Sequence, residues 1–170
     1  MKVAALQLCA SDDPVANLAH TLSMVQQASE AGAQFIATPE VTNCVSSSRR
    51  RQNEVLALQE NDQTLAAMCT AAARFGVWIS VGSLALKLPD DDRFTNRSFM
   101  IDPSGQIVAQ YDKIHMFDVT LSETEQYRES DGYRAGDHAV IADTAFGKIG
   151  MTICYDIRFP HLYRGLAKSG

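Results

Sequence analysis

The sequence has little concentrated positive charge. It contains 15 lysines and arginines against 20 acidic residues, a net charge of −5, and its longest basic run is Arg49 to Arg51. That triplet lies among serines, so we interpret it as a solvated loop rather than a phosphate-binding patch. Nucleic acid is therefore not an expected partner.

Long apolar runs are also absent. The first one, in MKVAALQL, is interrupted by Gln7 and followed by Asp12 and Asp13, which fits neither a signal peptide nor a membrane span. The four cysteines form no CxxC pair and no His–Cys spacing typical of zinc sites. We expect no metal and no membrane partner, and we predict reduced thiols in a cytoplasmic protein.

What the sequence does contain is enough apolar material for one core. The 170 residues are 46% hydrophobic and 21% charged, which is ordinary for a globular protein. Neither repeats nor linkers divide the chain. A single domain over residues 1–170 is the prediction.

The first half alternates between strands and helices. Residues 2–9 read as a buried strand, and Asp13-Pro14 then supplies an N-cap and first-turn proline for a helix that Gly32 ends. A strand beginning at Gln34, a helix over Leu65–Phe75 closed by Gly76 and a strand from Val77 follow. The apolar stripe of the first helix is expected at Val15, Leu18, Leu22, Val25 and Ala28. This order favours an α/β fold.

The second half changes character. Residues 96–101 and 106–111 predict a hairpin around an Asp-Pro-Ser-Gly turn, and residues 118–137 are polar without a period, as in a long surface loop. Strands over 139–141 and 148–153 follow, and Pro160 begins a last helix with Leu162 and Leu166 on one face.

Three apolar strands end in a potentially reactive side chain. Glu40 follows FIATP, Lys113 follows IVAQYD and Cys154 follows KIGMTI. Sites in open α/β sheets gather at the carboxyl ends of strands, so we expect one shared site. A carboxylate can take a thiol proton, and a lysine can stabilise charge on a carbonyl oxygen.

Each of the three residues also has a structural interpretation. Cys154 alone could be a small core residue, Glu40 a cap and Lys113 a solvated hairpin end. The local sequences decide between these interpretations. PEV at 39–41, YDKIHMFDV at 111–119 and CYDIRFP at 154–160 resemble, in the same order, the Glu, Lys and Cys motifs of the nitrilase superfamily of carbon–nitrogen hydrolases.

The resemblance covers all 170 residues and implies the αββα four-layer sandwich of that family. It implies Glu40 as general base, Lys113 as oxyanion-stabilising lysine, Cys154 as nucleophile and the Tyr155 N–H as an oxyanion donor. A second family glutamate corresponds to Glu129, with Glu123 and Glu125 as weaker candidates. The resemblance also implies a reaction that requires no cofactor. Because the family fold continues past the cysteine, the domain is expected to be incomplete at its C-terminus.

The motifs look most like the branch of omega-amidases and deaminated-glutathione amidases. That resemblance implies hydrolysis of a small, carboxylate-bearing amide to acid and ammonia through a thioester, with a homodimer or larger homo-oligomer as the assembly. N-carbamoyl amine hydrolysis and nitrile hydrolysis stay open. A substrate carboxylate needs a cation, and the candidates are Arg128, Arg134 and Arg158.

Two further alternatives stay open. In a Cys–His hydrolase, His115, His138 or His161 would activate Cys154. In a non-enzymatic fragment, the chain would bind or assemble without turnover. We also expect Asp156 and Arg158 to brace the turn after Cys154 by paired hydrogen bonds, and His115 to be a positioning or core residue.

Overall fold

A computed structural model describes all 170 residues and is built around one five-stranded sheet. The strand order is β1-β2-β3-β4-β5, parallel from β1 to β3 and antiparallel from β3 to β5. Two reversals leave β5 running in the same direction as β2, so both strands end at the same edge. The strands are β1 (Val3–Ala5), β2 (Phe35–Ala37), β3 (Trp78–Lys87), β4 (Phe94–Ile101) and β5 (Ile107–Asp112).

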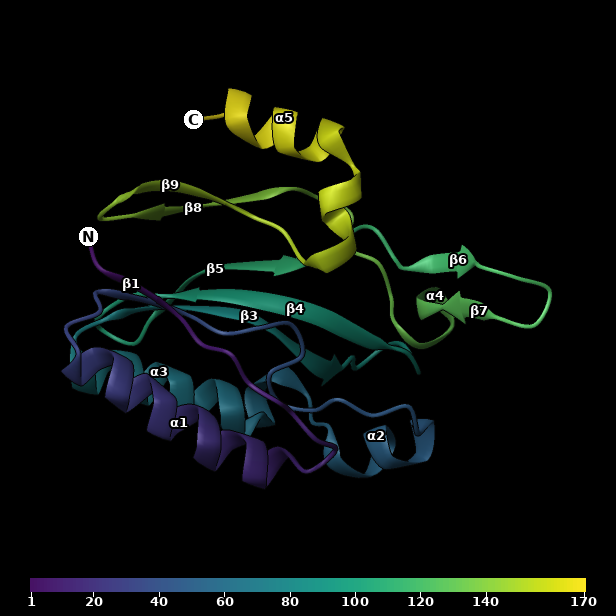
Figure 1. The fold of residues 1–170 in the computed structure, drawn as a ribbon, viewed down its shortest axis with the longest axis horizontal. Coiled ribbons are helices and arrows are strands. Elements are labelled where there is room, and N and C mark those ends of the chain that lie inside the picture. Colours follow the sequence, from purple (N-terminus) through teal and green to yellow (C-terminus); the bar gives the residue numbers. More distant parts are fainter.

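Two helices, α1 (Pro14–Glu30) and α3 (Gln63–Phe75), cover one face of this sheet (Figure 1). As predicted, Pro14 begins α1 and the Asp13 carboxylate accepts hydrogen bonds from the first-turn amides. Gly76 ends α3 in the left-handed region, at φ 64°. The helices and the sheet enclose a cluster of 14 buried apolar residues, among them Val25, Ile36 and Phe99. This burial is the main stabilising contribution of the layer.

The opposite face of the sheet is covered by the hairpin β8 (Val140–Thr144) and β9 (Gly147–Met151), and helix α5 (Pro160–Lys168) lies beyond the hairpin (Figure 1). A second core, with Met100, Tyr111 and Met151, joins the sheet to the hairpin. Leu166 of α5 packs over Gly150 of β9. The order of layers is helix, sheet, sheet, helix, and the predicted four-layer α/β architecture is confirmed.

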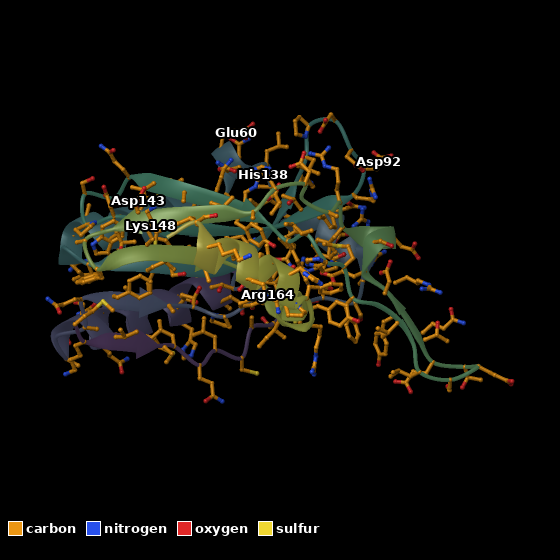
Figure 2. All side chains as sticks on the ribbon, turned by 90° about the horizontal axis from the view of Figure 1, so that it is seen from above. Glu60, Asp92, His138, Asp143, Lys148 and Arg164 are labelled. Carbon is orange, nitrogen blue, oxygen red and sulfur yellow. The ribbon has the colours of Figure 1, made fainter.

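Residues 118–137 differ from the predicted irregular loop. They form the hairpin β6 (Asp118–Thr120) and β7 (Gln126–Arg128), followed by the short helix α4 (Glu129–Gly132). Figures 1 and 2 both show the hairpin projecting from the body of the protein. Its strands bury no apolar face, so the alternation that identifies a strand in a sequence is missing.

The Arg49–Arg51 triplet is not a solvated loop, because it begins helix α2 (Arg49–Val55), capped by the Ser48 hydroxyl. The Arg49 guanidinium lies 3.9 Å from the centre of the Phe94 ring and donates to the Gly132 carbonyl at 2.9 Å. It therefore ties α2 to α4. Two short 3-10 helices complete the chain, η1 (Gln59–Asn61) and η2 (Cys154–Arg158).

Two details of the first strand and helix were also predicted wrongly. The strand over residues 2–9 is shorter and not buried, because β1 lies at the sheet edge and leaves Val3 half exposed. Val15 is exposed too, and the buried face of α1 instead includes Asn17, whose side chain donates to the Ser11 and Asn43 carbonyls. The stripe is otherwise present, with Val25 buried and Leu18, Leu22 and Ala28 packed against the core.

No helix in the structure is both long enough and apolar enough to span a membrane.

Candidate active site

The three predicted reactive residues line one cavity of about 620 Å³. Glu40 follows β2, Lys113 directly follows β5, and Cys154 follows β9 and begins η2. Glu40 and Lys113 meet at one edge of the five-stranded sheet, and the facing hairpin β8–β9 brings Cys154 to the same cavity, so the three residues share one site as predicted. The rest of the lining is Val41, Ser46, Ser47, Asn96, Phe117, Gln126, Tyr127, Arg128, Glu129 and Tyr133.

Lys113 lies at the centre of what we name the lysine cluster: Glu40, Asn96, Lys113 and Glu129. Its Nζ is 3.0 Å from Glu40 Oε1 and 2.9 Å from each carboxylate oxygen of Glu129. Asn96 Nδ2 donates to the same Glu40 oxygen at 2.8 Å. The structure thus places Glu129 where the family resemblance implies a second glutamate, whereas Glu123 and Glu125 do not line the cavity.

The lysine cluster keeps Lys113 charged. The side chain of Lys113 is only 2% exposed, and burial alone would lower the pKa of its ammonium. The hydrogen bonds and charges of Glu129 and Glu40 outweigh burial and raise the pKa of Lys113 above its ordinary value. A protonated lysine can donate to an oxyanion but cannot act as a base.

Cys154 is held as a thiol. Desolvation raises its pKa, and the charge of Glu40 and a hydrogen bond to Glu40 raise it further, while Lys113 acts in the opposite direction. Nucleophilic attack by this sulfur therefore needs a base, and Glu40 is a carboxylate that lines the same cavity. Cys154 also has a positive φ of 45°, a strained conformation for a residue with a Cβ.

The turn after Glu40 is strained in the same way. Val41 has a φ of 45°, which is rare for a β-branched residue, and its N–H donates to the Ser83 hydroxyl at 2.8 Å. Gly82 in β3 allows the backbone of Thr38, just before Glu40, to lie close to β3, since a Cβ on Gly82 would lie 2.0 Å from the Thr38 carbonyl oxygen. A glycine and a serine in β3 therefore fix the direction in which Glu40 leaves β2.

A second group of contacts lies beneath Cys154, and we name it the aspartate cluster: Tyr111, His115, Ile153 and Asp156. The Asp156 carboxylate is fully buried. It accepts hydrogen bonds from the Tyr111 hydroxyl at 2.6 Å, the His115 ring and N–H at 2.6 and 3.1 Å, and the Ile153 N–H at 2.8 Å. The aspartate cluster therefore connects the turn that contains Cys154 to Tyr111 and His115, which lie before and after Lys113 in the chain.

The predicted brace between Asp156 and Arg158 is wrong. Arg158 is exposed and makes no hydrogen bond to Asp156, because a residue two positions on in a 3-10 helix points to another side. His115, expected as a positioning or core residue, contacts Asp156, and its ring stacks on Phe159 with centroids 3.6 Å apart. Tyr155 packs its ring on Phe117 and Phe159.

The three candidate arginines are separated by the fold. Arg128, at the end of β7, lines the cavity. Arg134 bonds to Asp90 at 3.2 Å and does not line the cavity, and Arg158 lies outside it on η2. Only Arg128 among the three is placed beside the lysine cluster.

The histidines lie outside the cavity lining. His115 Nδ1 is engaged by Asp156, His138 lies on the surface beside Asp137 (Figure 2), and His161 is exposed on α5. No three His, Cys, Asp or Glu side chains gather in a way that could hold a metal ion. The geometry offers Cys154 a carboxylate as its base.

Sequence reasoning missed Asn96. It lies inside β4, is 2% exposed and contacts Glu40, 56 positions earlier in the chain. A polar residue in a strand that is otherwise buried is a signal that it has a partner, but nothing local identifies that partner.

Comparisons with known proteins identify the family of the chain. The sequence pattern of the carbon–nitrogen hydrolase family matches residues 2–170. The chain is 40% identical over 171 residues to a deaminated glutathione amidase of Yersinia enterocolitica, covering 99% of this chain and 59% of that protein. It is 29% identical to an omega-amidase of Saccharomyces cerevisiae, covering 100% of this chain and 60% of that protein.

The similarity extends to solved structures. The crystal structure of the NitFhit protein of Caenorhabditis elegans matches with a TM-score of 0.91 at 28% identity, over 99% of this chain and 41% of that one. The chain thus spans about three fifths of the length of the curated relatives named above. With the family pattern matched over nearly every residue, the chain belongs to the carbon–nitrogen hydrolase family.

Proposed function

We propose that this protein hydrolyses the amide of a small, carboxylate-bearing substrate to an acid and ammonia, through a thioester on Cys154. The observation that carries the proposal is one cavity wall that holds a charged lysine bonded to two carboxylates together with a thiol whose pKa one of those carboxylates raises. The similarity to a deaminated glutathione amidase and an omega-amidase supports an amide as substrate.

In the acylation step, Glu40 accepts the Cys154 proton while Sγ attacks the amide carbon. The carbonyl oxygen becomes negative and accepts hydrogen bonds from Lys113 Nζ and the Tyr155 N–H. Tyr155 is the second residue of η2, where helix geometry provides no partner for its N–H within the helix. When the C–N bond breaks, the proton on Glu40 passes to the nitrogen, and ammonia leaves.

In the deacylation step, water attacks the thioester carbon as Glu40 takes one of its protons. The C–S bond then breaks, the acid is released, and the proton returns from Glu40 to the Cys154 sulfur. Glu129 does not exchange protons in this sequence. In the resting site both of its oxygens accept from the Lys113 ammonium, and one of these N–H groups turns to the oxyanion during the reaction. Glu129 itself accepts from the Phe117 N–H at 2.6 Å.

The substrate carboxylate is assigned to Arg128, because this arginine lines the cavity while Arg134 is occupied by an aspartate. A guanidinium can bind a carboxylate with two parallel hydrogen bonds. Replacement of Arg128, Arg134 and Arg158 by glutamine, one at a time, tests the assignment. Only the Arg128 variant is expected to raise KM for a carboxylate-bearing amide.

The function itself is tested by ammonia release. We expect turnover of omega-amides of dicarboxylates and of deaminated glutathione, and its loss in Glu40→Gln and Cys154→Ala. Alanine variants of His115, His138 and His161 are measured beside them. A Cys–His hydrolase requires one of them to abolish turnover, whereas we expect only His115→Ala to reduce it, through the aspartate cluster. Activity on nitriles alone, or on N-carbamoyl amines alone, would contradict the amidase proposal. Substrate binding without turnover would favour a non-enzymatic protein.

A further inference from the structure

Asn96 makes contacts to two members of the lysine cluster at once. Its side-chain amide donates to Glu40 Oε1 at 2.8 Å, and its backbone carbonyl accepts from the Lys113 N–H at 3.0 Å. The residue belongs to β4, between the neighbouring strands of the sheet, and only 2% of it is exposed. A rigid, buried residue therefore sets the relative position of Glu40 and Lys113.

The other end of the Asn96 amide has no partner. Oδ1 is buried and accepts no hydrogen bond. An unpaired buried acceptor destabilises a protein, so this orientation of the amide requires an explanation. The opposite orientation would place Oδ1 against the Glu40 carboxylate, acceptor against acceptor. The orientation observed keeps the donor on Glu40 and leaves Oδ1 unpaired.

The two oxygens of Glu40 are consequently different. Oε1 accepts from both Lys113 and Asn96, whereas no N–H donates to Oε2. A proton placed on Oε1 would displace one of those two donors, so the free oxygen is the favourable proton acceptor. The carboxylate is thus prepared to exchange protons through one oxygen only.

We propose that Asn96 is a positioning residue that occupies Oε1 of Glu40 and directs the Cys154 proton onto Oε2. The inference rests on the proposed role of Glu40 as the base. The thiol S–H bond breaks, the O–H bond forms at Oε2, and the same proton leaves from Oε2 to the departing nitrogen. The Lys113 and Asn96 hydrogen bonds to Oε1 persist throughout, so the carboxyl group does not need to rotate between steps.

Asn96→Leu tests the proposal, because leucine has a similar size and neither donor nor acceptor. Glu40 then loses a donor that stabilises its ionised form. We expect kcat to fall by about 10- to 100-fold, the effect of a lost hydrogen bond to a charged group. The acid limb of the kcat profile should move to higher pH, and KM should change little. The thermal midpoint should not decrease, since the unpaired Oδ1 is removed as well.

Thr95→Val is the matched control. Thr95 precedes Asn96 in β4, is equally buried, and its hydroxyl is also unpaired, but it does not contact Glu40. Valine removes that hydroxyl without changing the shape, and the kcat profile should stay that of the parent protein. Asn96→Asp, which places a carboxylate against Glu40, should move the acid limb further in the same direction as Asn96→Leu.

Three outcomes would overturn the inference. They are an unchanged kcat–pH profile in Asn96→Leu, a shift of that profile in Thr95→Val as large as in Asn96→Leu, and a loss of kcat in Asn96→Leu that is explained by a lower thermal midpoint. If Asn96→Leu does not fold, the kcat–pH profile of Asn96→Asp tests the inference instead, and an acid limb that does not move in this variant would overturn it. Glu40→Gln is measured beside them. Turnover retained in Glu40→Gln overturns the proposed function, whereas its loss with a normal Asn96→Leu profile overturns only the role of Asn96.

Discussion

The lysine cluster and the aspartate cluster both bury a charged group, but the hydrogen bonds that surround this group differ between them. The Asp156 carboxylate is fully buried and receives four hydrogen bonds. Lys113 is almost as buried, yet one of its partners, Glu40, has a side chain that is 30% exposed and an oxygen that no N–H contacts. The fully paired cluster is suited to hold a turn, and the partly paired one to exchange a proton.

The two clusters are joined by one short segment. Tyr111 and His115 contact Asp156, and Lys113 lies between them in the chain. The aspartate cluster also holds the turn in which Cys154 has its positive φ. Geometry at the nucleophile and at the lysine therefore depends on a carboxylate that is outside the cavity lining.

Lys113→Met breaks the lysine cluster and should have the larger effect of the two cluster variants. The oxyanion loses a charged donor, and we expect kcat to fall by about a thousandfold. Glu40 and Glu129 would face each other without a cation, which we expect to lower the free energy of unfolding by about 2–4 kcal/mol, less than for a fully buried pair. Ammonia release and urea unfolding provide the two measurements.

The pH dependence of that stability loss follows from the raised pKa of Lys113. A group whose pKa is higher in the folded than in the unfolded protein contributes its full stabilisation of the fold at pH values below its unfolded pKa, near 10.5 for this lysine. That stabilisation is lost as the pH rises through the folded pKa. The stability difference between the parent protein and Lys113→Met should thus stay constant from about pH 6 to 9. A difference that shrinks within this window would show that Lys113 is not held as described.

Asp156→Asn breaks the aspartate cluster while keeping its shape. The new amide presents N–H groups to donors such as the Ile153 N–H, so at least one buried donor loses its acceptor. We expect the free energy of unfolding to fall by about 2–3 kcal/mol and kcat to fall by about tenfold or more. Arg158→Gln is the control in the same turn, with an expected stability change within about 0.5 kcal/mol. Equal losses in the two variants would contradict the assignment of the brace to Asp156.

Much of the fold could be predicted from local signals. Asp13 and Pro14 begin α1, Gly76 ends α3, and the apolar runs before Glu40, Lys113 and Cys154 end at the same edge of the protein. These features depend on neighbouring residues and on strand direction, both of which a sequence contains. The family motifs then placed Glu129 in the site, although its loop was expected to be irregular.

The contacts that join distant segments could not be predicted. Helix α2 had a capping signal in Ser48, but the arginine triplet was interpreted by its charge, and its packing on Phe94 depends on a strand more than 40 residues away. Arg158 has the charge to pair with Asp156 and points elsewhere because of the 3-10 geometry of η2. Asn96 meets Glu40 only through the register of β3 and β4.

The smallest expected effect concerns the reactivity of the Cys154 thiol. Glu40 raises the pKa of Cys154 by its charge and by a hydrogen bond, and Lys113 lowers it. Glu40→Gln should therefore lower the pKa of Cys154, even though it abolishes turnover. We expect alkylation by iodoacetamide at pH 8 to be faster by about tenfold, since the thiolate is the reactive form.

Lys113→Met should change the same rate in the opposite direction, because it removes the cation that lowers the pKa of Cys154. Mass spectrometry of the Cys154 peptide measures both rates, with Cys9, which is exposed and outside the cavity, as the internal reference. Asp156→Asn alters the turn but not the charges facing the sulfur, so its alkylation rate should stay closer to that of the parent protein. A slower reaction in Glu40→Gln would mean that Glu40 does not hold Cys154 as a thiol, and the distinction between a cluster that exchanges protons and one that holds geometry would fail.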